Sequence, residues 1–329
     1  MSNLKSFQDQ ISKVNDQNFE HIALELFRYQ AVNNPVYAKY LQALNKDVSG
    51  IQKLIEVPFL PISFFKTQEV KTGAWQEEGI FSSSGTTAAQ ASRHYVRRIS
   101  NYLQNTQACF EAIYGPIQHY NLFALLPAYL ERKDSSLVLM MDHFIKQSQT
   151  PFPGFYLYNT ADLLRDIDKA RQSDKQILLL GVSFALLDLA ENTQPDLSDC
   201  IIMETGGMKG RRKEITRQEL HTVLKQAFRV EVIHAEYGMT ELLSQAYAKH
   251  NGLFQCPNTM KVFIRDVNDP FSYLPAGRTG GINIIDLANA DSCAFIETED
   301  LGKWHEEGYF EVLGRFDQSD VRGCNLLFN

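Results

Sequence analysis

The spacing of apolar residues near the start of the chain predicts helices. Phe19, Ile22 and Leu26 recur at intervals of three and four residues, which is the spacing of one face of an amphipathic helix. The two prolines in the segment VPFLPISFFK then prevent a helix from continuing and favour extended backbone. We therefore expect residues 1–56 to form a helical N-terminal segment.

Between residues 57 and 245, short apolar runs alternate with amphipathic stretches. The expected helices cover residues 100–113, 135–145, 160–172, 183–191 and 212–228. The expected strands cover residues 121–127, 154–159, 176–181, 200–207 and 230–238. Strands that are apolar throughout and are separated by helices are typical of a parallel sheet covered on both faces. This region is therefore expected to be an α/β core.

After residue 245 the pattern changes to short β-type segments. These segments read KVFIRD, GGINIIDLA, CAFIETEDLG and YFEVLGR. We expect residues 246–329 to form a mixed β subdomain with a short C-terminal tail. The predicted fold class is thus α/β, with a mainly parallel sheet, helices on both faces, a helical N-terminal segment and a C-terminal mixed β subdomain.

Composition and charge narrow the class of protein. Hydrophobic residues make up 44% of the 329-residue chain and charged residues 22%, which is typical of a globular protein. The net charge of -7 argues against a general nucleic-acid binder, and the basic run KGRRK is interpreted as the solvated start of a helix. No secretory signal is visible, and no apolar run reaches the ~20 residues of a membrane span.

The cysteines point to a reducing compartment. There are five, scattered along the chain and never spaced C-x-x-C. This pattern favours reduced thiols of a cytoplasmic protein over disulfides, and it implies no metal cage built from Cys or His.

A run of small polar residues, FSSSGTT, lies between apolar segments. It supplies five hydroxyl groups and one glycine in the six residues from Ser82 to Thr87. Backbone N–H groups and hydroxyls of this kind can surround a polyphosphate. Taken alone, the run fits an ordinary polar turn equally well.

Four later segments change this interpretation. They are ETGGMKGR, YGMTE, ETEDLG and VLGRFDQSD, which begin at residues 204, 237, 297 and 312. Together with FSSSGTT they resemble, in order, the motifs of the adenylate-forming enzymes, which are the acyl- and aryl-CoA ligases and their relatives. The resemblance extends from about Val57 to the end of the chain.

Within that superfamily the sequence is most similar to the LuxE-type acyl-protein synthetases, the ligase component of the fatty acid reductase of luminous bacteria. The similarity is carried by VPFLPISFFK, FSSSGTT, LPAYLERKDSSLVLMM, ETGGMKGRRKEITRQEL and the ending DQSDVRGCNLLFN. It implies that ATP and Mg²⁺ are used to convert a fatty acid into an acyl adenylate. The acyl group would then pass to Cys324 as a thioester, for delivery to a partner reductase or acyltransferase.

The resemblance also assigns roles to residues of the phosphate end. The pyrophosphate of ATP would lie against Ser82, Ser83, Ser84, Gly85, Thr86 and Thr87. Thr240 and Glu241 would lie at the phosphate end, with Glu241 as the Mg²⁺ ligand, because hard oxygen ligands suit that ion.

A second group of residues would bind the nucleoside. Gly206 and Gly207 would let the backbone approach adenine, and Tyr237, followed by Gly238, would stack on the base. Asp300 would accept hydrogen bonds from the ribose hydroxyls, and Arg315 would contact ribose or the α-phosphate.

The sequence departs from the family pattern at the phosphate loop and near Asp300. Ala88 and Glu299 replace glycines, and the segment after the loop carries Arg93 where the family often has lysine. The family's small C-terminal lobe, with its catalytic lysine, has no counterpart in the sequence. The missing charge would come from Arg93, from Arg315 or from another subunit.

Three further interpretations of the sequence remain open. The segment GVSFA approximates a nucleophile elbow, so a serine hydrolase would use Ser183, although Ala185 replaces the second glycine. The candidate bases are His221, His234, His250 and His305. The second interpretation is a phenylacetate-type acyl-CoA ligase, and the third is a non-catalytic protein that binds nucleotide or acyl chains. The sequence specifies neither the acyl chain length nor the oligomeric state.

Overall fold

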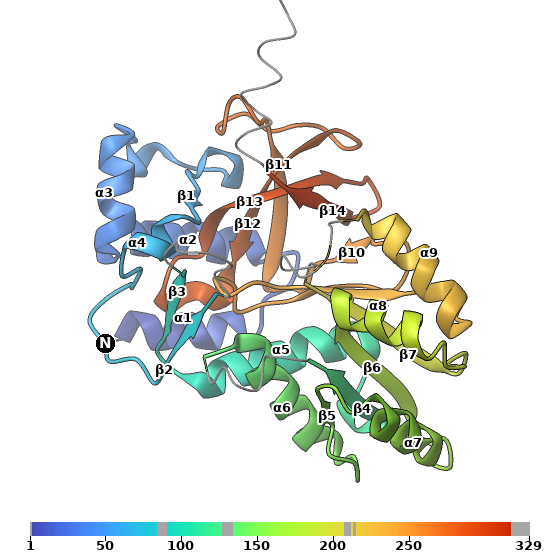
Figure 1. The fold of residues 1–329 in the computed structure, drawn as a ribbon. Helices are drawn as coiled ribbons and strands as arrows, with labels where there is room; N and C mark the ends of the chain where they lie inside the picture. The colour runs from blue at the N-terminus through green and yellow to red at the C-terminus, as the bar shows by residue number, and fades with distance from the viewer. Residues whose placement is uncertain (1, 84–90, 127–133, 207–211, 213–214, 317–329) are drawn as a thin grey trace, which may run out of the picture.

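The computed structural model describes residues 2–83, 91–126, 134–206, 212 and 215–316 (Figure 1). Within these residues the strands form one sheet of 12 strands and a separate two-stranded hairpin. The α/β fold class is confirmed.

The N-terminal segment is helical, as predicted. It contains α1 (Ser2–Ile11), α2 (Phe19–Asn33), α3 (Pro35–Ala43) and the short 3-10 helices η1 (Val48–Gly50) and η2 (Leu54–Glu56). Helix α3 begins where it does because the Asn34 side chain accepts hydrogen bonds from the first backbone amides and Pro35 occupies the first turn. The proline-rich segment then gives only a short strand, β1 (Leu60–Pro61), before helix α4 (Phe64–Thr67).

One half of the sheet is parallel and carries helices on both faces. Its strands lie in the order β5 (Phe155–Tyr156), β4 (Tyr120–Leu125), β6 (Gln176–Val182), β7 (Cys200–Thr205) and β8 (His234–Tyr237). The helices are α5 (Ile99–Tyr114), α6 (Ser136–Ser148), α7 (Thr160–Ala170), α8 (Ser183–Asn192) and α9 (Arg217–Phe228). Figure 1 shows the pair α5 and α6 on one side of these strands and the pair α8 and α9 on the other.

Helix α9 begins later than the sequence predicted. The predicted start was residue 212, but Arg212 lies in a bend and pairs with Asp188 and Glu191 of α8. The helix starts after Thr216, whose side chain accepts from Glu219 N while the Glu219 carboxylate accepts from Thr216 N. This capping box, and not the basic run, fixes the helix start.

The other half of the sheet is antiparallel and continues directly from β8. The order is β9 (Ala246–Ala248), β10 (Phe254–Gln255), β14 (Tyr309–Arg315), β13 (Phe295–Trp304), β12 (Thr279–Asp286) and β11 (Met260–Arg265). The sheet as a whole is therefore mixed, and the description "mainly parallel" applies to the α/β half. The predicted boundary at residue 245 falls between two hydrogen-bonded strands, β8 and β9.

The N-terminal helices share a core with the antiparallel half. Phe27 of α2 packs edge-to-face on Phe295 of β13, with ring centroids 5.8 Å apart, and Tyr37 of α3 stacks on the same ring at 6.2 Å. A second apolar cluster lies between the parallel strands and helices α5 to α9. Residues from the two ends of the chain thus form one of the two cores.

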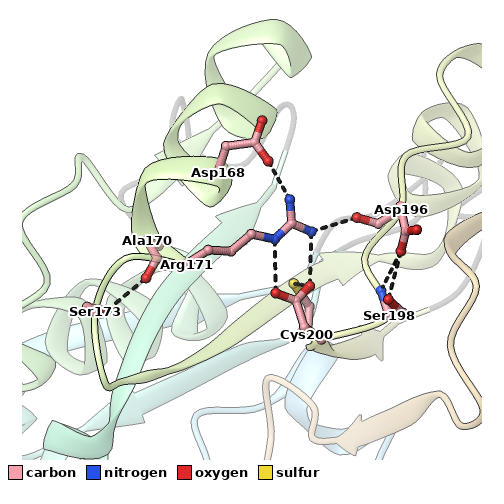
Figure 2. Close-up of polar contacts among 8 residues, drawn as sticks. Asp168, Ala170, Arg171, Ser173, Asp196, Ser198 and Cys200 are labelled. Carbon is pink, nitrogen blue, oxygen red and sulfur yellow. Dashed lines mark hydrogen bonds and ion pairs between the residues drawn. The ribbon is translucent and has the colours of Figure 1, made fainter.

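An arginine clasp holds the amino-terminal edge of the parallel strands (Figure 2). Arg171, which follows α7, donates to both carboxylate oxygens of Asp199 at 2.9 Å and to Asp196 O at 2.6 Å, and it also pairs with Asp168. These carboxylates are about half exposed, so the clasp contributes on the order of 1 kcal/mol or less. It lies at the strand ends opposite to the candidate site.

A buried carboxylate joins the end of β12 to the segment after the YGMTE motif. Asp286 Oδ2 accepts from Leu243 N at 2.8 Å and from Ser244 N at 2.9 Å. Its Oδ1 accepts from Ser244 Oγ at 2.6 Å and from Ala288 N at 3.1 Å. The side chain is fully buried, so these four donors take the place of water around the carboxylate.

Residues 286–294, which include the 3-10 helix η4 (Leu287–Asp291), also connect to the N-terminal helices. The buried Gln30 side chain of α2 donates to Asn289 O and Ala290 O, each at 3.1 Å, and accepts from Ala294 N at 2.9 Å. Asn289 in turn donates to Glu241 O at 2.8 Å. The 286–294 segment therefore links α2 to the YGMTE loop.

We predict that Asp286→Ala lowers the free energy of unfolding by about 3 kcal/mol, because it removes the acceptor shared by the buried amides of Leu243 and Ser244, the Ser244 hydroxyl and the Ala288 amide. Urea unfolding followed by circular dichroism measures this change. Asp269→Ala, which removes an exposed turn carboxylate, is the matched control and should change stability by less than about 1 kcal/mol. Equal losses in the two variants would contradict the linking role of Asp286.

Candidate functional site

The Ser/Thr run begins at the end of one strand of a hairpin. Strands β2 (Gly79–Ser82) and β3 (Arg93–Val96) are antiparallel, with Ser82 opposite Arg93. Ser83 N donates to Ser92 O at 3.1 Å, and Ser92 N donates to Ser83 Oγ at 2.9 Å. These bonds close the base of the loop. The predicted phosphate ligands Ser84, Gly85, Thr86 and Thr87 lie outside the described residues.

A buried histidine in β3 holds the hairpin against the YGMTE loop. His94 Nδ1 lies 2.9 Å from Thr240 O, and Nε2 lies 2.9 Å from Ser292 Oγ. A carbonyl oxygen can only accept, so the proton resides on Nδ1 and Nε2 accepts from the Ser292 hydroxyl. We call this pair of contacts the His94 bridge.

Glu241 lies directly beside the base of the Ser/Thr loop. Its side chain is buried, and burial raises the pKa of the carboxyl, although a hydrogen bond with the Ser92 side chain and the charge of Arg315 oppose the rise. Thr240, the preceding residue, is partly exposed. The structure thus brings the base of the Ser/Thr run and the YGMTE motif together.

The surroundings of Glu241 fit a magnesium ion bound together with a nucleotide. Among the described residues there is no group of three His, Cys, Asp or Glu side chains able to hold a metal. Magnesium in nucleotide sites commonly uses one or two carboxylates together with phosphate oxygens and water. A single buried carboxylate whose charge is poorly compensated, such as Glu241, suits that mode of binding.

Asp300 lies between Tyr237 and Arg315. The Tyr237 hydroxyl donates to Asp300 Oδ2 at 2.7 Å, and Arg315 Nε lies 3.4 Å from Asp300 Oδ1. The register of β13 and β14 puts Asp300 directly opposite Arg315. Burial raises the pKa of the Asp300 carboxyl, and the charge of Arg315 only partly offsets this because its side chain is 77% exposed.

The ring of Tyr237 belongs to an aromatic cluster. Its centroid lies 5.8 Å from that of Phe254 and 5.7 Å from that of Phe310, and the side chain is buried. The contact made by its hydroxyl orients Asp300. Stacking of this ring on a base stays a prediction.

Two of the predicted glycines, Gly206 and Gly238, lie at the carboxyl ends of β7 and β8. Gly206 follows β7 with a φ of 67°, a conformation that favours glycine, and its carbonyl accepts from Ser183 Oγ at 2.7 Å. Gly238 follows β8 and is exposed, whereas Gly207 lies outside the described residues. Ligands of open parallel sheets bind at this edge.

The geometry of Ser183 does not support a serine hydrolase. Its hydroxyl is buried and donates to Gly206 O and, at 3.2 Å, to Glu204 Oε2. These two oxygens take the place that the base of a hydrolase would occupy, and the histidine of this cluster, His221, lies 3.6 Å from the other oxygen of Glu204.

A cavity of about 560 Å³ lies between α1, α5 and the 286–294 segment. Its lining combines apolar side chains with the Arg97–Asp291 ion pair and includes His94 and Ser292. Of the predicted site residues that the structure describes, none lines this cavity. It is therefore separate from the predicted nucleotide residues, and His94, which lines it, contacts the Thr240 carbonyl.

The structure gathers several predicted residues and adds others that the motifs did not indicate. Glu241, Asp300 and Arg315 are close enough that the charges of the last two affect the pKa of the first. Ser92 and His94 were not predicted, although a serine and a histidine directly after a candidate phosphate loop were a usable signal. The roles of all these residues stay predictions.

No family model and no curated protein sequence matches the chain. Solved structures match its fold. An open conformation of 2-hydroxyisobutyryl-CoA ligase in complex with 2-HIB-AMP and CoA has a TM-score of 0.65 and 12% identity, covering 91% of this chain and 70% of that chain. ATP-bound MatB from Rhodopseudomonas palustris has a TM-score of 0.53 and 14% identity, covering 72% of this chain and 47% of that chain.

A third similar structure is O-succinylbenzoate coenzyme A synthetase from Bacillus subtilis in complex with AMP. Its TM-score is 0.50 at 16% identity, covering 73% of this chain and 49% of that chain. The matches span about half the length of MatB and of this synthetase. At these identities the likeness shows that the chain shares the fold of these proteins. Across the described part of the chain, every helix is too short or too polar to cross a membrane.

The His94 bridge predicts a specific pH dependence of stability. Burial lowers the pKa of His94 from its ordinary value of 6.5 to about 4. Between these values the unfolded chain binds a proton that the folded chain does not, so stability falls as the pH falls through this window, by about 3 kcal/mol in total. Urea unfolding of the wild type and of His94→Gln between pH 4 and 7 measures this loss of unfolding free energy.

The two proteins are compared by plotting the free energy of unfolding against pH. The difference between the two curves gives the contribution of His94 alone, because both proteins keep His234, whose pKa is also lowered by burial. The wild type should lose its advantage over His94→Gln as the pH falls. Parallel curves across this range would show that His94 is not buried in its neutral form.

Proposed function

We propose that the chain is an ATP-dependent ligase that activates a carboxylic acid as an acyl adenylate. The observation that carries this proposal is that Glu241 lies beside the base of the Ser/Thr loop, within electrostatic range of the facing pair Asp300 and Arg315. These residues come from three separate segments. The solved structures that share the fold include proteins bound to ATP or AMP, which supports the assignment.

Each of these residues has a role suited to its surroundings. Asp300 would accept hydrogen bonds from ribose, with Tyr237 holding its other oxygen, and Arg315 would face ribose or the α-phosphate. Glu241 would hold Mg²⁺, which supplies positive charge to the phosphate oxygens when bound. Arg93, exposed at the start of β3, is the cation nearest in sequence to the loop.

The first step transfers adenylate to the acid. A carboxylate oxygen of the substrate attacks the α-phosphorus of ATP, the bond from this phosphorus to the bridging oxygen breaks, and pyrophosphate leaves. The charge that develops on the phosphoryl oxygens is the charge that Arg315 and Arg93 would stabilise.

The second step would form a thioester on Cys324. Its thiolate attacks the acyl carbon, the bond to the AMP oxygen breaks, and AMP leaves while the thiol proton passes to water. Cys324 lies outside the described residues. The described cysteines, which are Cys109, Cys200, Cys256 and Cys293, are poor competitors, because burial raises the pKa of each thiol to about 12.

A thioester of this kind fits a LuxE-type acyl-protein synthetase that serves a partner reductase or acyltransferase. Free CoA is the alternative acceptor, as in an acyl-CoA ligase, and the CoA bound in the 2-hydroxyisobutyryl-CoA ligase structure favours testing it. A non-catalytic role in binding nucleotide or acyl chains is the outcome if neither step occurs.

We predict that the protein exchanges labelled pyrophosphate into ATP only when a fatty or other carboxylic acid is present. Glu241→Gln should lower the exchange rate about a hundredfold, because it removes a charged ligand at the phosphates. Asp300→Asn should raise KM for ATP about tenfold, because it weakens charged hydrogen bonds to ribose. The control is Glu306→Gln, an exposed carboxylate in the turn between β13 and β14. Absence of exchange over a panel of chain lengths would contradict the ligase.

A separate prediction concerns the acyl acceptor. Incubation with ATP and labelled fatty acid should give a protein label that hydroxylamine removes, and Cys324→Ser should abolish this label while pyrophosphate exchange continues. Cys256→Ser, the partly buried control, should keep the label. A label that persists on Cys324→Ser, or acyl-CoA as the sole product when CoA is added, would exclude Cys324 as the acceptor.

A further inference from the structure

A buried carboxylate at the end of β7 connects three elements of the α/β half. Glu204 is only 2% exposed. Its Oε1 accepts from Arg217 Nε of α9 at 2.9 Å, and its Oε2 accepts from Ser183 Oγ at the start of α8. Arg217 lowers the pKa of this carboxyl against the effect of burial. Arg217 and Glu204 therefore form an ion pair in which the carboxylate is buried and the guanidinium is partly exposed, and the carboxylate lies two residues before Gly206.

Arg217 also reaches across to the antiparallel half. Its Nη1 donates to Val312 O of β14 at 2.7 Å, and the guanidinium lies 4.9 Å from the centroid of the Phe254 ring in β10. A guanidinium can bind a carboxylate and a carbonyl at the same time because its donors are fixed in a planar fork. Lysine, with a single nitrogen, cannot reproduce both contacts.

The Val312 carbonyl lies at an irregularity in β14. Gly302 pairs with Val312 and Leu301 pairs with Gly314, so Leu313 is an extra residue on this strand. Gly314 has a φ of 146°, which favours glycine. A bulge of this kind bends the strand and redirects the side chains that follow it. The next residue is Arg315, which the register then places opposite Asp300.

We propose that Arg217, held by Glu204, is a positioning residue that fixes the β14 bulge and thereby keeps Arg315 facing Asp300. The proposal rests on the proposed function, because it assigns Arg315 to the nucleotide. Arg217 acts on Arg315 through Val312, and the Arg315 side chain is itself 77% exposed. The Glu204–Arg217 pair thus joins the predicted adenine edge at β7 to the predicted ribose pair at β13 and β14.

The test combines hydrogen exchange with kinetics on the full chain. Arg217→Lys should speed amide exchange in residues 309–315 relative to residues 295–299, and should raise KM for ATP about tenfold, the loss expected for one charged hydrogen bond. In a double-mutant cycle, Arg217→Lys should add nothing to the effect of Arg315→Ala on KM, since both changes remove the same contact to nucleotide. A residue that only stabilises the fold would give additive effects.

Two further variants keep the test decisive. Glu204→Gln/Arg217→Met removes both charges of the pair together, so that the buried carboxylate is not left without its partner if Arg217→Lys folds poorly. Arg229→Lys is the matched control: it ends the same helix, pairs with Asp196 at 2.9 Å and is 66% exposed, so it should change neither readout.

The proposal would be overturned if amide hydrogen exchange in β14 were unchanged in both Arg217→Lys and the double variant. Additive effects of Arg217→Lys and Arg315→Ala on KM for ATP would also overturn it. If the wild type shows no acid-dependent pyrophosphate exchange, the ligase function fails. Faster amide exchange in β14 of the Arg217 variants would still support the positioning role in that case. The two failures are therefore distinguishable.

Discussion

The fully buried carboxylate of Asp286 is the interaction on which the geometry of the site most directly depends. The carboxylate accepts hydrogen bonds from the two backbone amides that follow the YGMTE motif. It also accepts one from Ala288 N, which fixes the start of η4. The loop cannot shift without leaving buried donors unsatisfied, which is costly in a dry interior. Asn289 and Ser292 from the same segment then hold Glu241 O and His94. The position of Glu241 is thus set through its backbone, and its carboxylate does not have to contribute to the fold.

The electrostatics of the site oppose stability and favour ligand binding. Burial raises the pKa of both Glu241 and Asp300, and the charge of Asp300 adds to the rise at Glu241. Arg315 compensates only in part because most of its side chain is in water. A nucleotide with its magnesium ion would bring the missing positive charge to Glu241, so binding and ionisation would be coupled. Sites that break a rule of stable folding in this way are commonly functional.

The elements of the parallel half could be predicted because each is encoded locally. The helix expected over residues 100–113 spans Ile99–Tyr114, and the strand expected over 176–181 spans Gln176–Val182. The sheet connection through β10 could not be predicted, since β10 has two residues and its partner in β14 lies far along the chain. The start of α9 was missed because the hydrogen bonds of one capping side chain outweigh the composition of the preceding run.

The residues that support the site were harder to predict than those expected to touch the ligand. Glycines, hydroxyls and carboxylates of the motifs are visible as short local patterns. The His94 side chain hydrogen-bonds the Thr240 carbonyl, 146 residues away, and the Gln30 side chain hydrogen-bonds the Asn289 carbonyl, 259 residues away. Pairs this far apart leave no local pattern in the sequence. Three of the links between separate segments of the site are His94 to Thr240, Asn289 to Glu241 and Arg217 to Val312. In every one a side chain binds a backbone carbonyl, so the receiving residue's own side chain remains available for the ligand. The fold therefore positions the loop and strand backbones independently of the side chains that would carry the chemistry.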